Sequence, residues 1–360
     1  MPASGWPASA EVLDLGRGRQ LGIVERMMKM RYVAPERVES RALSADSLRL
    51  LTEVAWTAIG AYAISVTGVR FLASHSNTTF EILTRSRERF ALRIGMPLAE
   101  AAADLHTELT WLDAVGQHTP IRATKTISTR TGELWTLALV AGENVPRRCV
   151  LFTWLPGVPL DECLSSHNYR RLGRVSAILH NFSETWAEPE GLKPLVWDRV
   201  FYFPGEPIVI FDSVHRDLIT PSRARMISKV IDSSEKILTR LHLNNRPLFV
   251  HGDLHMRNVM VENQELAIFD VEDVMRACPV QDIAITLHYG RQRPDYRELF
   301  NAFRNGYEPI RSWPVHYPGQ LEELMAARSI MLLNRALRTA KNPVAFADRV
   351  VTSLDAFLRN

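Results

Sequence analysis

The decisive stretch of this sequence reads Phe249-Val250-His251-Gly252-Asp253-Leu254-His255-Met256-Arg257-Asn258. Short apolar runs surround it. The first delivers His251 to Asp253, a second spans 259–261, and a third, 266–269, delivers Asp270. Short apolar runs bounded by polar residues predict strands. The sequence therefore predicts a loop set between short strands, with carboxylates and a carboxamide at its corners.

The spacing of these polar residues indicates their chemistry. Asp253 and Asn258 are separated as the Asp and Asn of a protein-kinase catalytic loop are. Phosphoryl transfer from ATP needs a carboxylate that accepts a hydroxyl proton, and oxygen ligands that hold magnesium. Asp253 suits the first task, and Asn258 with Asp270 suits the second. Ordinary turns are the alternative interpretation, because these residue types also concentrate there, but two separate turns would not require this order and spacing.

A family resemblance rests on this stretch and on two others, Asp270-Val271-Glu272-Asp273 and Gln281-Asp282-Ile283-Ala284. Together they resemble the aminoglycoside phosphotransferase and choline kinase superfamily, and most of all its branch of type II homoserine kinases and stress response kinase A. The resemblance implies an α+β, bilobal protein-kinase-like fold, with a small N-lobe containing an antiparallel sheet and a larger, mainly helical C-lobe. It also implies an ATP- and Mg²⁺-dependent phosphotransferase in which a buried Asp282 supports the catalytic loop.

Composition bounds the class of protein. A chain of 360 residues with 46% hydrophobic content can bury an extensive core. Its 43 basic and 40 acidic residues nearly balance, so we expect no nucleic-acid partner. Three cysteines are too few for a disulfide framework, and neither a membrane-spanning stretch nor a secretory signal is evident. These features predict a cytoplasmic protein with no membrane partner.

Changes of pattern divide the chain into four parts. Residues 1–43 lack sustained periodicity, which predicts a poorly ordered leader. Residues 44–152 read as one helix followed by short strands and a further helix, which predicts the nucleotide-binding N-lobe. Pro and Gly within 153–159 predict a hinge. Helical periodicity in 160–360 predicts the C-lobe, with the catalytic loop and the acceptor site.

Nucleotide contacts are predicted from the N-lobe and the hinge. The loop 74–79 occupies the place of a kinase glycine-rich loop but has no glycine, so it either binds phosphate through amides and hydroxyls or is a plain hairpin turn. Arg93 stands where a kinase has its phosphate-contacting lysine. The resemblance implies adenine hydrogen bonds to the backbone of 152–155. The candidate nucleotide-binding residues are Ser76, Asn77, Thr78, Arg93, Glu108, Phe152, Thr153, Trp154 and Leu155.

Glu108 is the candidate partner of Arg93, as the kinase helix glutamate pairs with lysine. Glu100 and Asp104 are rivals for that role, and a solvated charge on an amphipathic helix is the alternative for Glu108. His180 is a lone histidine, which is more often a core residue than a catalyst.

The sequence does not identify the molecule that accepts the phosphoryl group. An irregular, aromatic and acidic segment, 181–221, is either the recognition site for an amine-bearing acceptor or a surface excursion. The candidates are a small molecule (an amino alcohol, a hydroxy amino acid or an aminoglycoside-like compound) and a protein Ser or Thr, as in the stress response kinase branch. A nucleotide-binding pseudokinase is the non-enzymatic alternative. Whether Glu272 or Asp273 contributes a second metal contact is also open.

Overall fold

The antiparallel sheet and the long helices expected from the sequence are both present in the computed structural model, which describes residues 43–74, 77–97 and 104–359. They combine in the predicted α+β, bilobal protein-kinase-like arrangement. The predicted leader, except for its last residue, lies outside the described ranges, as do Ser76 and Glu100.

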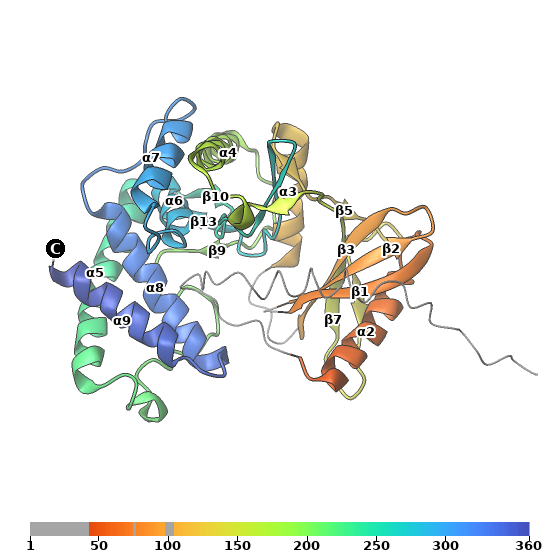
Figure 1. Cartoon of the computed structure of the whole chain (residues 1–360), viewed down its shortest axis with the longest axis horizontal. Coiled ribbons are helices and arrows are strands. Elements are labelled where there is room, and N and C mark those ends of the chain that lie inside the picture. The colour runs from red at the N-terminus through yellow and green to blue at the C-terminus, as the bar shows by residue number, and fades with distance from the viewer. Residues whose placement is uncertain (1–42, 75–76, 98–103, 360) are drawn as a thin grey trace, which may run out of the picture. The chain divides into compact units, whose positions relative to one another are not determined.

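The N-lobe is an antiparallel sheet with helix α2 (Ala45–Ile59) packed against it, as Figure 1 shows. The helix begins at Ser44, whose Oγ accepts a hydrogen bond from the Ser47 amide at 3.1 Å. Strand order is β1-β2-β3-β7-β5, and β6 also pairs with β7. The strands are β1 (Val66–Ser74), β2 (Thr78–Thr84), β3 (Arg89–Pro97), β5 (Thr126–Ile127), β6 (Thr136–Ala138) and β7 (Arg147–Thr153).

Alternation along these strands builds the core of the N-lobe. Phe80 and Ile82 on β2, with Leu92 and Ile94 on β3, are fully buried, because every second side chain of a strand points to the same face. They pack with the apolar face of α2 in one hydrophobic cluster. Strand β3, which carries Arg93, is therefore supported on one face by a packed layer.

Helix α3 (Leu105–His118) packs into the other, larger hydrophobic cluster, together with the C-lobe. Trp111 is fully buried there, and its indole N–H donates to Ser183 Oγ at 3.3 Å. The helix begins at Asp104, whose Oδ2 accepts a hydrogen bond from the Thr107 amide at 3.0 Å. Asp104 is thus the N-cap of the helix rather than the partner of Arg93.

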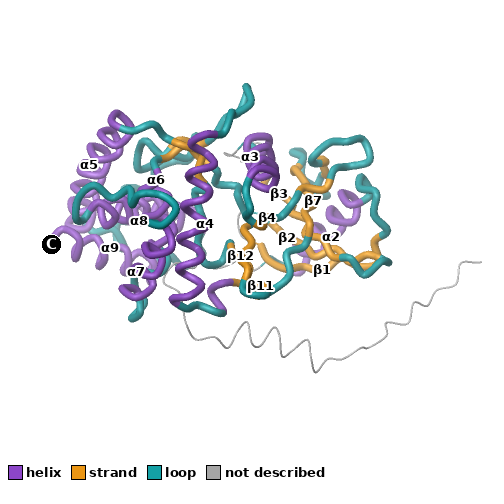
Figure 2. Tube along the Cα trace, turned by 90° about the horizontal axis from the view of Figure 1, so that it is seen from above, coloured by secondary structure: helices purple, strands orange, loops and turns teal. Residues whose placement is uncertain are grey.

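Six helices of the described chain build most of the C-lobe, and Figure 2 shows α4 running beside α7. Gly306 permits this approach, because a Cβ there would lie 1.7 Å from the Arg170 carbonyl oxygen. No helix in the described ranges is both long and apolar enough to cross a membrane. The helices are α4 (Ser166–Thr185), α5 (Pro221–Asn244), α6 (Pro279–His288), α7 (Tyr296–Tyr307), α8 (Gln320–Thr339) and α9 (Val344–Arg359).

Two small sheets lie between the helices and the N-lobe strands. The first has the order β4-β12-β11-β8 and the second β10-β13-β9. In the first sheet, segments on both sides of β7 in the chain, β4 and β8, flank the hairpin of β11 and β12. The strands are β4 (Arg122–Ala123), β8 (Val158–Pro159), β9 (Leu195–Val196), β10 (Leu248–Val250), β11 (Val259–Glu262), β12 (Glu265–Ile268) and β13 (Met275–Ala277).

The packing predicts how the cysteines react. Cys149 and Cys278 are buried, and burial raises the pKa of each thiol to about 12, whereas Cys163 is partly exposed. The thiolate is the reactive form, so at neutral pH we expect a thiol reagent to modify only Cys163 in the native protein and all three cysteines in denaturant. Mass spectrometry of the labelled protein measures this. Rapid native labelling of Cys149 or Cys278 would contradict the packing.

Candidate active site

The hairpin of β11 and β12 places the two predicted metal ligands at one end. Val259 pairs with Ile268, and one residue further the Phe269 amide donates to the Asn258 carbonyl at 3.1 Å. Asp270 follows with φ of 58°, in the left-handed region that turns the chain sharply. Asn258 and Asp270 therefore leave the same end of the hairpin, where the loop that follows β10 also arrives.

Gly252 brings that loop against the turn between β12 and β13. Its φ is 76°, and a Cβ there would lie 2.1 Å from the Asp273 carbonyl oxygen, so only glycine fits. Its amide donates to Asp282 Oδ1 at 3.0 Å. The other oxygen of Asp282 lies 3.0 Å from His180 Nε2, and His180 Nδ1 lies 2.9 Å from the Tyr307 hydroxyl.

All the side chains of this network are buried. His180 is a core residue, as expected, but through Asp282 it also helps to hold the loop. Because the unpaired burial of such groups is costly, the network holds the loop backbone in one position.

The Asp253 carboxylate is surrounded by hydrogen-bond donors. Oδ1 accepts from the Tyr289 hydroxyl at 2.9 Å and from Arg328 Nη2 at 3.0 Å. Oδ2 lies 3.3 Å from Asn258 Nδ2 and 3.4 Å from His255 Nε2. Burial opposes ionisation, but His255, Arg328 and the Tyr289 hydroxyl outweigh it and hold the pKa of Asp253 below its usual range. The carboxylate is therefore ionised and ready to accept a proton.

A cluster of further carboxylates lies beside it. Loss of hydration, and then repulsion from neighbouring carboxylates, raises the pKa of Asp270, Glu272 and Asp273, while Arg93 acts in the opposite direction on the first two. The Asp270 side chain remains 41% exposed, so ions from solution can reach it. Such a cluster is stabilised by added positive charge.

The donors at the end of the hairpin fit a hard divalent cation. Asn258 Nδ2 donates to the Asp253 carbonyl at 2.9 Å, which leaves Asn258 Oδ1 directed away from Asp253. Within the described residues, no group of three His, Cys, Asp or Glu side chains is arranged to hold a metal. An amide and a carboxylate oxygen, completed by phosphate and water, are the ligand types that Mg²⁺ takes in nucleotide sites. The residues present therefore fit this ion.

Arg93 and Glu108 form the predicted ion pair. Arg93 Nη2 donates to Glu108 Oε2 at 2.7 Å, and Nη1 lies 3.9 Å from Asp270 Oδ1. Burial alone would lower the pKa of Arg93, but Glu108 reverses this and keeps it permanently charged. Glu108 is 3% exposed, so it is not a solvated helix charge. Glu108 thus holds the charged Arg93 guanidinium of β3 at the edge of the carboxylate cluster.

The predicted nucleotide-binding residues of the loop and the hinge differ in whether their hydrogen-bonding groups already have a partner within the protein. The Asn77 side chain donates to Glu272, whereas the Thr78 hydroxyl is hydrogen-bonded to Ser74 at 3.0 Å. Both backbone groups of Thr153 are hydrogen-bonded within the protein: its amide donates to the Lys125 carbonyl, and its carbonyl accepts from the Thr124 hydroxyl.

Phe152 pairs within the sheet, and its ring lies 5.2 Å from the Arg93 guanidinium. Trp154 and Leu155 form no backbone hydrogen bond to any described residue. Of the predicted hinge residues, these two have backbone N–H and C=O groups that can hydrogen-bond to a ligand. Arg89 stacks over the Trp154 ring at 3.8 Å and holds it in place.

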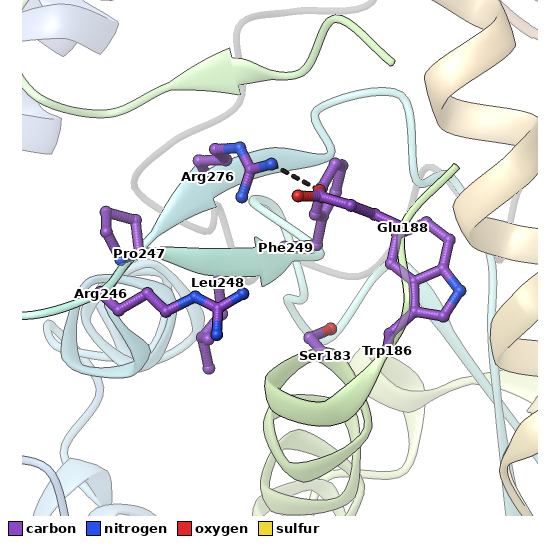
Figure 3. A pocket seen from close by; sticks show the side chains of 8 residues that line it. All are labelled: Ser183, Trp186, Glu188, Arg246, Pro247, Leu248, Phe249 and Arg276. Carbon is purple, nitrogen blue, oxygen red and sulfur yellow. Dashed lines mark hydrogen bonds and ion pairs between the residues drawn. The ribbon is translucent and has the colours of Figure 1, made fainter. Parts of the chain in front are cut away.

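A small pocket lies on the other side of β10 and contains none of these residues. Figure 3 shows the ion pair between the Arg276 and Glu188 side chains, with the Phe249 side chain beside it. The Arg276 guanidinium also lies 4.7 Å from the Phe249 ring. The ion pair joins β13 to the segment after α4, and the ring contact joins β13 to β10, so we assign the pocket to the packing that supports the loop. It is lined by Ser183, Trp186, Glu188, Arg246, Pro247, Leu248, Phe249 and Arg276.

Several residues of the site were missed at the level of sequence. His255 lies inside the motif but was given no role. Tyr289 had a usable signal, because it stands seven residues after Asp282 and therefore on the same face of α6 as that residue and at its end. Arg328 lies 75 residues from Asp253 and carries no local signal.

Gly252 allows a direct test of the loop geometry. Gly252→Ala adds left-handed strain and a clash with the Asp273 carbonyl, whereas Gly142→Ala adds strain alone, since Gly142 has φ of 87° and nothing within 4 Å. We expect Gly142→Ala to cost about 1 kcal/mol of unfolding free energy and Gly252→Ala about 1–3 kcal/mol more. Denaturant unfolding measures both. Equal losses would contradict the close approach.

Comparisons of sequence and fold relate the chain to known proteins. The profile of the phosphotransferase enzyme family matches residues 67–318. No curated protein matches the chain. The fold is similar to a microcompartment-associated aminopropanol kinase, with a TM-score of 0.68, 19% identity, and coverage of 85% of this chain and 95% of that one.

Two other solved structures share the fold. An amicoumacin kinase, solved with AMP-PNP and Ca²⁺, has a TM-score of 0.67 at 18% identity and covers 86% of this chain and 93% of its own. A spectinomycin phosphotransferase, solved with ADP and spectinomycin, has a TM-score of 0.58 at 14% identity and covers 89% and 100%. Since the family profile covers well over half of the sequence, the chain belongs to the phosphotransferase enzyme family and is an ATP-dependent phosphotransferase.

Proposed function

We propose that this protein transfers the terminal phosphoryl group of ATP to a hydroxyl of a small molecule, with Mg²⁺ and with Asp253 as the catalytic base. One observation carries the proposal. The ionised Asp253, the Asn258 carboxamide and Asp270 converge at one end of the β11–β12 hairpin. Phosphoryl transfer needs these three groups together, because catalysis rests on positioning and charge neutralisation.

The chain's own residues suffice for the remaining steps. Asp253 orients the acceptor hydroxyl and takes its proton as that oxygen bonds to the terminal phosphorus. The bond from this phosphorus to the bridging oxygen breaks, and its electron pair leaves with ADP. Arg93, held by Glu108, steadies the phosphates, and Trp154 and Leu155 offer backbone groups to adenine. Asn258 and Asp270 would hold magnesium, which would neutralise part of the phosphate charge when bound.

The acceptor proposed is an amine-bearing hydroxy compound: an amino alcohol, a hydroxy amino acid or an aminoglycoside-like molecule. Loss of hydration is the main cause of the raised pKa values of Glu272 and Asp273, and repulsion from Asp270 on Glu272 and from Asp253 on Asp273 adds to it. An ammonium group bound beside them would relieve that repulsion. The structural neighbours named above act on small molecules, which supports the same class. A pseudokinase has no physical need to keep Asp253, Asn258 and Asp270 together.

Replacing the base tests the role of Asp253. We expect Asp253→Ala to reduce turnover by at least about 1,000-fold while leaving ATP affinity nearly unchanged, because the base acts in the transition state. ADP formation and nucleotide titration measure the two quantities. Asp355→Ala, which removes a surface carboxylate paired with Arg359, is the matched control. Normal turnover by Asp253→Ala would exclude Asp253 as the catalytic base.

Replacing the metal ligands separates binding from proton transfer. Asn258→Ala and Asp270→Ala should weaken nucleotide binding in the presence of Mg²⁺ by about tenfold or more, with little change in its absence, because they remove the ion's protein oxygens. Calorimetric titration with and without Mg²⁺ checks this. Unchanged Mg²⁺-dependent affinity in both variants would exclude them as ligands.

A screen of acceptors tests the substrate class. Amino alcohols, hydroxy amino acids, aminoglycosides and a generic protein substrate are compared for acceptor-dependent ADP release. Stimulation by an amine-bearing small molecule supports the proposal. Stimulation by the protein alone favours a Ser/Thr kinase, and tight ATP binding without any turnover favours a pseudokinase.

A further inference from the structure

We propose, on the basis of the function above, that Arg328 and Tyr289 hold the Asp253 carboxylate by its Oδ1 atom so that Oδ2 receives the proton of the acceptor. Arg328 is then a positioning residue of the reaction, supplied by helix α8. Asp253 remains the catalytic residue.

The two oxygens of Asp253 have unequal partners. Oδ1 accepts two well-formed hydrogen bonds, from Tyr289 at 2.9 Å and from Arg328 at 3.0 Å. A carboxylate oxygen has two lone pairs, so Oδ1 is saturated. Oδ2 has only contacts of 3.3 Å to Asn258 and 3.4 Å to His255, which are longer than normal hydrogen bonds to a charged group. Oδ2 is therefore the oxygen that can gain most from a hydroxyl donor.

The neighbours of Oδ2 are also easily displaced. His255 Nδ1 accepts the Arg257 amide at 3.1 Å, so the proton of a neutral His255 ring lies on Nε2, facing Asp253. Asn258 already has a shorter bond to the Asp253 carbonyl, at 2.9 Å. Loss of either contact to Oδ2 leaves no charge unpaired.

Arg328 is an unusual residue for its place. It is 2% exposed in the middle of α8, its Nη1 donates to the Tyr202 hydroxyl, and its Nε has no hydrogen-bond partner among the described residues. An apolar side chain of similar volume usually serves stability as well as a buried ion pair does. The incomplete satisfaction of this guanidinium is more readily explained by the task of holding Asp253 than by stability alone.

The geometry also fixes the direction of the carboxylate. Tyr289 ends α6, the helix whose Asp282 binds the Gly252 amide, and Arg328 Nη2 also lies 3.4 Å from the Tyr289 hydroxyl. Two helices thus hold one oxygen from one side. Rotation of the carboxylate would break two hydrogen bonds, and misplacement of a reacting atom by about 1 Å costs on the order of 100-fold in rate.

The test compares steady-state ADP formation by Arg328→Gln, Arg328→Lys and Tyr289→Phe, with the best acceptor of the screen and with water alone. We expect Arg328→Gln to lower kcat by about 10- to 100-fold with KM for ATP within about twofold, because the residue acts on the base and not on nucleotide. Arg328→Lys retains the charge and should recover part of kcat. Tyr289→Phe should lower kcat less, and it keeps the question answerable if Arg328→Gln fails to fold.

The decisive comparison uses Asp253→Ala as a background. If Arg328 acts through Asp253, Arg328→Gln has no further effect on the residual turnover of that variant. An equal loss in both backgrounds would show a structural role and overturn the inference. Arg223→Gln, which removes the α5 partner of Asp348, controls for loss of an arginine and should match the wild type.

The outcomes separate this inference from the function on which it rests. No ADP formation by the wild type under any condition would overturn the proposed function and the inference with it. Wild-type turnover together with undiminished kcat in Arg328→Gln and Tyr289→Phe would overturn the inference alone.

Discussion

The hydrogen bond from the Gly252 amide to the buried Asp282 carboxylate is the constraint on which the site depends. It joins the loop after β10 to helix α6, and the His180 and Tyr307 side chains extend it to α4 and α7. A buried carboxylate is stable only when its oxygens are paired, so the loop backbone cannot leave without exposing an unsatisfied charge. Asp253, the next residue, is positioned by that requirement.

Charge balance is the second constraint. The site gathers Asp253, Asp270, Glu272 and Asp273 in a small volume, and their mutual repulsion opposes folding. Arg93 offsets part of it on one side and Arg328 on the other. The remaining negative charge is the physical basis of the proposed binding of a cation. Function and folding therefore make opposite demands on the same residues, as is common at active sites.

Helix α3 and the strands that precede and follow β7 in the chain, β4 and β8, connect the carboxylate cluster to the proposed nucleotide-binding residues. Glu108 projects from a helix whose other face packs into the large core, yet it pairs with Arg93 on the N-lobe sheet. Strands β4 and β8 pair with the hairpin that carries Asn258 and Asp270. The proposed nucleotide contacts and metal ligands are thus connected through backbone hydrogen bonds rather than through exposed side chains alone, which favours a fixed geometry.

The sequence by itself predicted the fold class through its family resemblance. It also predicted the grouping of Asp253, Asn258 and Asp270, because these residues lie close together in the chain, where strand and loop spacing sets their geometry. The kinase-like order of elements also predicted the Arg93–Glu108 pair. Only the tertiary structure decided that the Thr153 backbone is hydrogen-bonded while those of Trp154 and Leu155 are not, and that Arg328 contacts Asp253. Contacts between residues so distant in the chain leave no local pattern, since packing of whole helices and strands creates them.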